Sequence, residues 1–252
     1  MHIIARVLTQ LQPSPTTLRS NRNRSGVAIT MAANDPLSFF SRLATKLNTE
    51  WLRKTHLFAG FGRGVSIHYS CDIGRASSQD IFVGDRVYMA ADVWLNIASG
   101  SKESGPRIIL ASGCKVGRRS IISARNRIVL EEDVLLAPSV LVMDHNHEYA
   151  DTKAPIHAQG ITAGGRITVG RNCWLGYNSV IFCGDGELSL GRNSVVGANS
   201  VVTKSFPPFS VIAGNPAKLI KIYDQALGKW VRVAAETSEK DYTRSFDGNS
   251  SR

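Results

Sequence analysis

Apolar residues recur at intervals of about six between Phe61 and Thr203, and they fall into six groups of three. The eighteen positions are Phe61, Ile67, Ile73, Val83, Met89, Leu95, Leu110, Val116, Ile122, Leu130, Leu136, Val142, Val169, Leu175, Ile181, Leu190, Val196 and Val202. Four residues after the first two members of each group, the residue is always Val, Cys or Ser. This alternation of large and small residues predicts coils of three short strands joined by tight corners, with the large side chains inside.

Small residues at the corners explain part of the composition. Glycine follows the apolar position at eight steps, where we expect the corners to need backbone freedom. These glycines are Gly62, Gly74, Gly84, Gly117, Gly170, Gly176, Gly191 and Gly197. Cys71, Cys114 and Cys173 occupy small interior positions, and only Cys183 lies outside the repeat. Without any CxxC pair, the cysteines predict neither a disulfide scaffold nor a metal site.

Departures from an 18-residue coil locate the insertions. Successive groups begin 22, 27, 20, 39 and 21 residues apart, so the longest insertion is the loop 143–166. Asp144, His145, His147 and Glu148 stand at the start of this loop. Histidine is suited to general base chemistry at neutral pH, which makes this cluster the candidate catalytic site. Asp144, Glu148 or a backbone carbonyl could each orient the imidazole, and the sequence does not choose between them.

Four segments resemble the O-acetyltransferase branch of the hexapeptide-repeat family, and they read DHNHEY, GRITVGRNCWLGYNSVI, GANSVVTKSFPP and IAGNPAKLIK. The resemblance implies an all-β fold, a left-handed parallel β-helix of about six coils over residues 58–215, with N-terminal and C-terminal helices. It also implies transfer from acetyl-CoA to a sugar or polysaccharide hydroxyl, in a homotrimer with its site between two prisms. His145 matches the family's general base, with Asp144, His147 and Glu148 as candidate supporting residues. Transfer would be direct, without a covalent intermediate.

The same resemblance implies a set of residues that bind coenzyme A. The amides of Tyr177 and Ala198 would line the pantetheine arm, the outward Trp174 would wall the cleft, and basic side chains would meet the phosphates. The full set is Trp174, Tyr177, Ala198, Thr203, Lys204, Lys218 and Lys221. No metal is expected.

The two ends of the chain depart from the repeat. Residues 35–57 predict an amphipathic helix, whose apolar residues recur every four positions at Phe39, Leu43, Leu47 and Trp51. We expect this helix to cap the β-helix, and a helix lying on a membrane surface is the alternative. Residues 216–235 predict a C-terminal helix with Pro216 in its first turn.

Both termini are polar. Residues 1–34 carry four arginines and no acidic residue, and they are interpreted as a disordered basic tail, a transit-like extension or a segment upstream of a start at Met31. Residues 236–252 predict a disordered tail. The start of the chain has no continuous apolar region of the signal-peptide type, so we expect a cytoplasmic protein, with the inner membrane surface as a further location.

The net charge of +10 among 252 residues favours an anionic partner. Coenzyme A phosphates are the first candidate, because the basic residues are spread out and no nucleic-acid recognition motif is present. An N-acetyltransferase acting on an antibiotic or amino sugar is the leading alternative. A zinc protein similar to γ-type carbonic anhydrases is less favoured, because its histidine spacing is missing. A β-helix module without catalytic activity is the remaining alternative.

Overall fold

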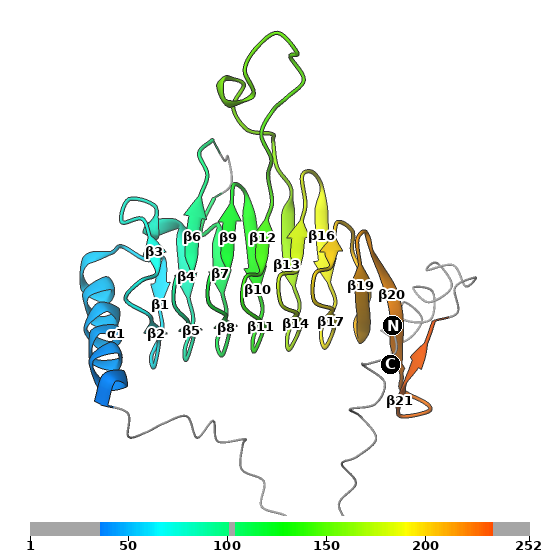
Figure 1. Ribbon diagram of the computed structural model, residues 1–252, viewed down its shortest axis with the longest axis horizontal. Helices are drawn as coiled ribbons and strands as arrows, with labels where there is room; N and C mark the ends of the chain where they lie inside the picture. The colour runs from blue at the N-terminus through cyan, green and yellow to red at the C-terminus, as the bar shows by residue number, and fades with distance from the viewer. Residues whose placement is uncertain (1–35, 101–103, 234–252) are drawn as a thin grey trace, which may run out of the picture. The chain divides into compact units, whose positions relative to one another are not determined.

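The structure, a computed structural model, describes residues 36–100 and 104–233, with side chains from Phe39 onward. The tails expected at residues 1–34 and 236–252 therefore lie outside the described residues. One α-helix, α1 (Pro36–Thr55), precedes a series of short strands that coil into a left-handed parallel β-helix (Figure 1). The all-β fold and the helix expected over residues 35–57 are confirmed.

Each coil contributes one strand to each of three sheets, which form the three faces of a prism. Sheet A contains β1 (Gly60–Phe61), β4 (Ile81–Val83), β7 (Ile108–Leu110), β10 (Arg127–Leu130), β13 (Arg166–Val169) and β16 (Glu187–Leu190). Sheet B contains β2 (Ser66–Ile67), β5 (Tyr88–Met89), β8 (Lys115–Val116), β11 (Leu135–Leu136), β14 (Trp174–Leu175), β17 (Val195–Val196), β19 (Ser210–Gly214), β20 (Ala217–Asp224) and β21 (Lys229–Arg232). Sheet C contains β3 (Asp72–Ile73), β6 (Trp94–Ile97), β9 (Ile121–Ala124), β12 (Leu141–Met143), β15 (Val180–Phe182) and β18 (Val201–Val202).

The apolar repeat sets the register of these sheets. In sheet C, for example, Ile122 pairs with Val142, which pairs in turn with Ile181. All eighteen predicted positions point inward, and all except the half-buried Phe61 are buried. The core is therefore three stacks of large apolar side chains along the prism, and each coil buries its apolar face against its neighbours.

The corner glycines serve a purpose other than the one expected from the sequence. None of the eight has a positive φ, and the left-handed corner positions are occupied instead by residues such as Asn172 and Asn193, both with φ of 57°. Asparagine tolerates this conformation better than most residues. At most of these glycines the backbone of the next coil passes very close: a Cβ at Gly176 would lie 2.6 Å from the Val196 carbonyl oxygen.

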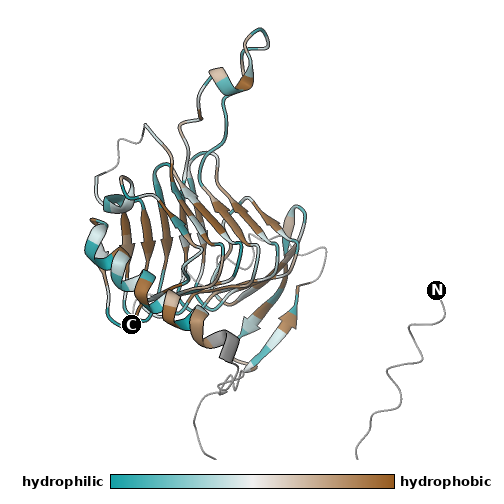
Figure 2. Ribbon diagram, turned by 60° about the vertical axis from the view of Figure 1, so that its left-hand side comes forward, coloured by the Kyte–Doolittle hydropathy of each residue, from teal (hydrophilic) through white to brown (hydrophobic). Residues whose placement is uncertain are grey.

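Helix α1 covers the N-terminal end of the prism with its polar face inward (Figure 2). Thr49 and Leu52 are buried, and the Thr49 hydroxyl accepts the N–H of Ile67 at 2.9 Å. The predicted apolar residues at Phe39, Leu43, Leu47 and Trp51 all remain exposed. The cap is thus confirmed, and the inward face is the polar one.

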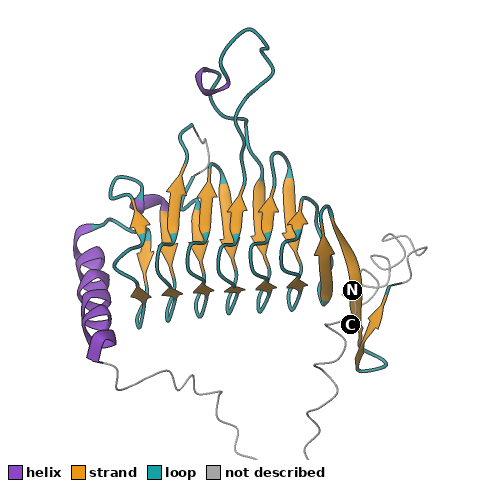
Figure 3. Ribbon diagram, in the orientation of Figure 1, coloured by secondary structure: helices purple, strands orange, loops and turns teal. Residues whose placement is uncertain are grey.

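The helix expected at residues 216–235 is wrong for the described part of this segment, residues 216–233, which strands β20 and β21 occupy (Figure 3). Strand β19 adds a seventh parallel strand to sheet B beside β17, and β20 then folds back antiparallel to β19. Ala217, Leu219 and Ile222 are buried on β20, whereas Lys218 is exposed. This alternation, together with the hydrogen-bonding edge that β19 offers, favours a strand over a helix.

Candidate functional site

The insertions gather along one edge of the prism, where chains leave sheet C and enter sheet A. The predicted loop 143–166 is observed between β12 and β13, contains the short 3-10 helix η3 (Ile156–Ala158), and projects beyond the other loops (Figure 1). A further insertion on the same edge, between β3 and β4 of the first coils, contains η2 (Ser78–Asp80). Because these loops stack on neighbouring coils, side chains at their bases are brought together along this edge.

Asp144 anchors the base of the longest loop. Its side chain is fully buried, and its carboxylate accepts three backbone N–H groups of the preceding coil: Arg125 at 2.6 Å, Asn126 at 2.9 Å and Arg127 at 3.0 Å. A buried carboxylate requires such donors to offset its desolvation. The carboxylate is therefore fixed in position by the main chain.

His145 receives its orientation from this carboxylate. Its Nδ1 lies 3.0 Å from Oδ1 of Asp144, and its side chain is only 10% exposed. A carboxylate can only accept hydrogen bonds, so Nδ1 carries the proton and Nε2 keeps a free lone pair. Among the orienting groups that the sequence left open, the structure favours Asp144.

His147 and Glu148 lie further along the loop, in a short ladder between its two arms. The backbone of His147 pairs with Ile161, and the N–H of Glu148 donates to the carbonyl of Gly160 at 3.1 Å. The His147 side chain is exposed. Arg125 braces the ladder by donating to the Ile161 carbonyl at 2.8 Å. These contacts give His147 and Glu148 a part in the structure of the loop.

A hollow lies on the coils that follow the Asp144–His145 pair, toward the C-terminal end of the prism. It is lined by residues 182–187 and by Thr203, Lys204 and Ser205, so two of the predicted coenzyme A residues lie at this edge. Strand β15 places this hollow next to the loop, since Phe182 pairs with Met143, two residues before His145. The arrangement places a cationic side chain and hydroxyls on the same edge of the prism as the candidate base.

Cys183, the cysteine outside the repeat, packs at the base of the same loop. Burial raises the pKa of its thiol above the ordinary value, so the thiol stays protonated at neutral pH. A Cβ at Gly165 would lie 2.5 Å from its sulfur atom, so only glycine fits there. Cys183 is thus a packing residue that fixes the second arm of the loop.

The other predicted coenzyme A residues lie on sheet B and its corner with sheet C. Trp174 pairs with Val195, which pairs with Val211, which pairs with Lys221, so these residues form one outward row across four strands. Trp174 is half exposed. The structure therefore divides the predicted set between this surface and the hollow at the loop edge.

Tyr177, Ala198 and Lys218 complete the second group. Tyr177 and Ala198 occupy the corner after β14 and the corresponding corner one coil later, and both are exposed. Lys218 pairs with Ala213, whose Cβ lies beside Gly197. Lys218 and Lys221 were expected on one face of a helix. In the strand, Lys218 is exposed and Lys221 is half-buried.

Sequence reasoning missed the backbone donors at residues 125–127. Any residue except proline supplies an N–H group, so the letters of the segment RNR carry no signal for this role. The cluster becomes visible only when the coil brings positions 18 residues apart into contact. Across residues 36–100 and 104–233, no group of three or more His, Cys, Asp or Glu side chains is arranged to hold a metal ion.

Comparison with known proteins agrees with this architecture. Residues 166–204 match the family described as the hexapeptide repeat of succinyl-transferase. A probable acetyltransferase of Mycobacterium tuberculosis is 27% identical over 178 residues, covering 71% of this chain and 53% of that protein. WbbJ of Escherichia coli, named for lipopolysaccharide biosynthesis O-acetyl transfer, is 35% identical over 118 residues, covering 44% of this chain and 59% of WbbJ.

Among solved structures, the N-acyltransferase AntD of Bacillus cereus, crystallised with dTDP and 3-hydroxybutyryl-CoA, has a TM-score of 0.57. It is 18% identical, and the match covers 79% of this chain and 96% of AntD. This likeness concerns the fold. The chain spans about half the length of the curated relatives it matches.

Proposed function

Since this chain belongs to the hexapeptide-repeat acetyltransferases, we propose that it transfers an acetyl group from acetyl-CoA to a hydroxyl of a sugar or polysaccharide. The observation that carries this proposal is the Asp144–His145 pair, joined at 3.0 Å and fixed by three backbone N–H groups. It provides an imidazole with a free Nε2 at the base of the longest loop.

The proposed reaction needs one proton acceptor and forms no covalent intermediate with the enzyme. Nε2 of His145 takes the proton of the acceptor hydroxyl while the hydroxyl oxygen attacks the thioester carbonyl carbon. The tetrahedral intermediate then breaks its C–S bond, and the imidazolium returns the proton to the thiolate. The products are an acetyl ester and free coenzyme A. The Asp144 carboxylate stabilises the imidazolium in between, and general base catalysis of this kind contributes ~10²–10⁴-fold.

Coenzyme A would bind beside this base. Thr203 and Lys204 line the hollow on the same edge of the prism, and the row that ends in Trp174 and Lys221 offers an aromatic surface and a further cation. Anionic phosphates pair well with such lysines. The two groups of residues would meet different parts of the same long cosubstrate.

A hydroxyl acceptor is favoured over an amine because of the base itself. A sugar hydroxyl is a weak nucleophile until a base removes its proton, whereas a neutral amine attacks before losing one. The N-acyltransferase alternative is tested by the product. An acetyl ester is cleaved by hydroxylamine and an amide resists it, so a resistant product would replace our assignment with N-acetylation.

The test of the base is His145→Gln, assayed by release of coenzyme A with a panel of sugars and nucleotide sugars. We expect kcat to fall at least 100-fold while calorimetry shows unchanged affinity for coenzyme A. His68→Gln, which alters an imidazole at the corner after β2, is the matched control. Near-normal turnover in His145→Gln would refute the assignment.

We also propose that the chain forms homotrimers through the outer face of sheet C. One outward row of paired residues across this sheet is apolar after Asp72, namely Trp94, Ile121, Leu141, Val180 and Val201. Such a flat apolar row is typical of an interface. Sedimentation velocity should give a trimer that Leu141→Lys dissociates and Val129→Lys, on the outer face of sheet A, leaves intact. A monomeric wild-type chain at micromolar concentration would refute this proposal.

A further inference from the structure

Helix α1 exposes five large apolar side chains on the face that points away from the prism. We call these residues the outer face of α1. They are Phe39 (61% exposed), Phe40 (70%), Leu43 (42%), Leu47 (62%) and Trp51 (57%). Scattered apolar residues are normal on protein surfaces, but a continuous group of this size on one helix marks an interaction surface.

This exposure follows from how the helix caps the prism. The other face of α1 contacts the first coil, where Thr49 and Leu52 are buried and Asn48 donates to the Ile67 carbonyl at 3.4 Å. Since the polar face is used on the protein, the apolar face has nothing to cover it within the described chain. Rotating the helix to bury Leu47 would remove the hydrogen bonds of Thr49.

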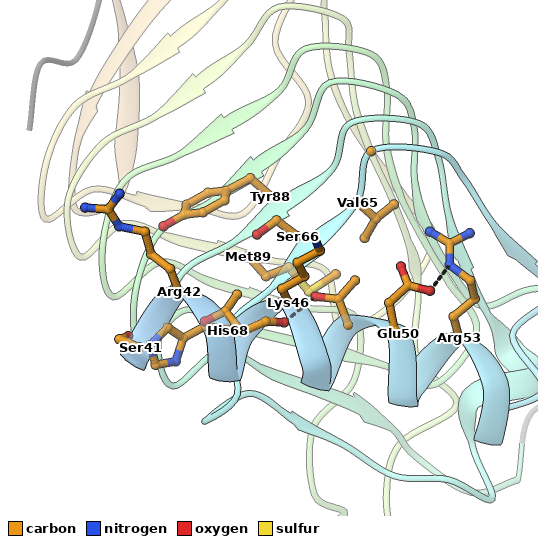
Figure 4. A pocket seen from close by; sticks show the side chains of 13 residues that line it. Ser41, Arg42, Lys46, Glu50, Arg53, Val65, Ser66, His68, Tyr88 and Met89 are labelled. Atoms are coloured by element: carbon orange, nitrogen blue, oxygen red, sulfur yellow. Dashed lines mark hydrogen bonds and ion pairs between the residues drawn. The ribbon is translucent and has the colours of Figure 1, made fainter. Parts of the chain in front are cut away.

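Basic side chains border the outer face of α1. Arg42 and Lys46 lie on the flank where α1 meets sheet B, beside His68 and Tyr88, in a pocket between the helix and the first coils (Figure 4). Lys54 lies near the helix end and is exposed. This combination places cations next to a band of apolar side chains, which is the pattern of helices that lie in a membrane interface.

The charge of the whole N-terminal part has the same sign. Residues 1–57 contain eight of the 30 basic residues and two of the 20 acidic ones, so they carry +6 of the net charge of +10. One of these two acids, Glu50, lies 3.5 Å from Arg53. An anionic surface is therefore the electrostatic complement of the N-terminal part of the sequence.

We propose that the outer face of α1 docks on an anionic lipid surface, with its apolar side chains at the acyl boundary and Arg42 and Lys46 at the level of the phosphates. No helix in residues 36–100 and 104–233 is long and apolar enough to cross a membrane. A second copy of the chain fits less well, because pairing two such faces would bring Arg42, Lys46 and Lys54 against the same cations of the other copy.

The experiment uses the full chain and vesicles of phosphatidylcholine, with and without 30% phosphatidylglycerol. We expect co-sedimentation with the anionic vesicles only, weakened by salt. Leu47→Ser should weaken binding at least tenfold, because it replaces an apolar side chain at the acyl boundary by a polar one. Leu227→Ser is the matched control, since Leu227 is 59% exposed in the turn between β20 and β21.

Two charge-reversal variants test the electrostatic part of the proposal. Lys46→Glu should weaken binding to anionic vesicles at least fivefold, whereas Lys229→Glu at the other end of the prism should have little effect. Circular dichroism melts confirm that each variant folds. The proposal is overturned if the wild-type chain does not bind anionic vesicles, or if a variant on α1 and its matched control weaken binding equally. It is also overturned if Leu47→Ser changes the sedimentation coefficient in the absence of lipid. The last result would show that another copy covers this face.

Discussion

Replacing Asp144 by asparagine removes one acceptor oxygen without changing the size of the side chain. Four donors point at the carboxylate: the N–H of Arg125 and Nδ1 of His145 at Oδ1, and the N–H groups of Asn126 and Arg127 at Oδ2. An asparagine has one oxygen, so its NH₂ group must face two of these donors whichever way it is placed.

The two placements differ in cost. With NH₂ at the Oδ2 position, two backbone N–H groups lose their acceptor. With NH₂ at the Oδ1 position, only the N–H of Arg125 loses it, because His145 can change tautomer and accept from the amide. The second placement costs less, about 2–3 kcal/mol, the value for one hydrogen bond to a charged group together with a buried donor left unpaired. It moves the imidazole proton to Nε2, which can then no longer accept a proton from an acceptor hydroxyl.

We therefore expect Asp144→Asn to lower the free energy of unfolding by about 2–3 kcal/mol and kcat by ~10²–10⁴-fold. Urea unfolding measures the first effect, and release of coenzyme A at saturating acetyl-CoA measures the second. Asp151→Asn is the control, since that carboxylate is exposed on the loop and accepts the backbone N–H of Lys153 at 2.8 Å. Unchanged stability would refute the buried network. Lower stability with unchanged kcat would refute the tautomer argument and leave the network intact.

Three further results are expected. Gly165→Ala should lower the free energy of unfolding by about 1–3 kcal/mol in urea, because its Cβ would collide with the Cys183 sulfur, and an unchanged midpoint would contradict this packing. Ile128→Ala should cost about 2–5 kcal/mol and the neighbouring outward Val129→Ala, on the outer face of sheet A, much less, so equal costs would contradict the register. Burial raises the pKa of the Cys114 thiol to about 12 from 9.0. The unfolded thiol loses its proton first, so stability should fall as pH rises above about 9, by up to about 1.4 kcal/mol per pH unit, and less in Cys114→Ala.

The coil itself could be predicted from the sequence because each position of the repeat has one local environment. A residue such as Val142 contacts its equivalents one coil before and one coil after, Ile122 and Ile181, whatever the rest of the chain does. An apolar period of about six residues is therefore enough to predict the coiled fold. The position of His145 could be found for the same reason, since the insertion that carries it is a break in this period.

The misassigned segments are those whose partners lie outside the repeat. Residues 217–224 read equally well as one helical face or as an alternating strand, and only the free edge of β19 decides between the two. The Asp144 site depends on backbone N–H groups, which no residue type encodes. The corner glycines were found correctly, but their role depends on the distance to the next coil, which appears only in three dimensions.

The polar inner face of α1 follows from the end of a β-helix. Ser66 and His68 donate to the carbonyls of Val87 and Met89 on the next strand, which leaves the N–H and carbonyl of Ile67 pointing away from the prism. These groups need partners, because an unpaired buried backbone group is costly. Thr49 supplies a hydroxyl that accepts from the Ile67 N–H at 2.9 Å and lies 3.2 Å from its carbonyl oxygen. A helix that caps an open sheet edge must therefore turn hydroxyl and amide side chains inward. Its apolar residues are then free for a partner outside the chain, which is why the same helix can both close the fold and dock on a lipid surface.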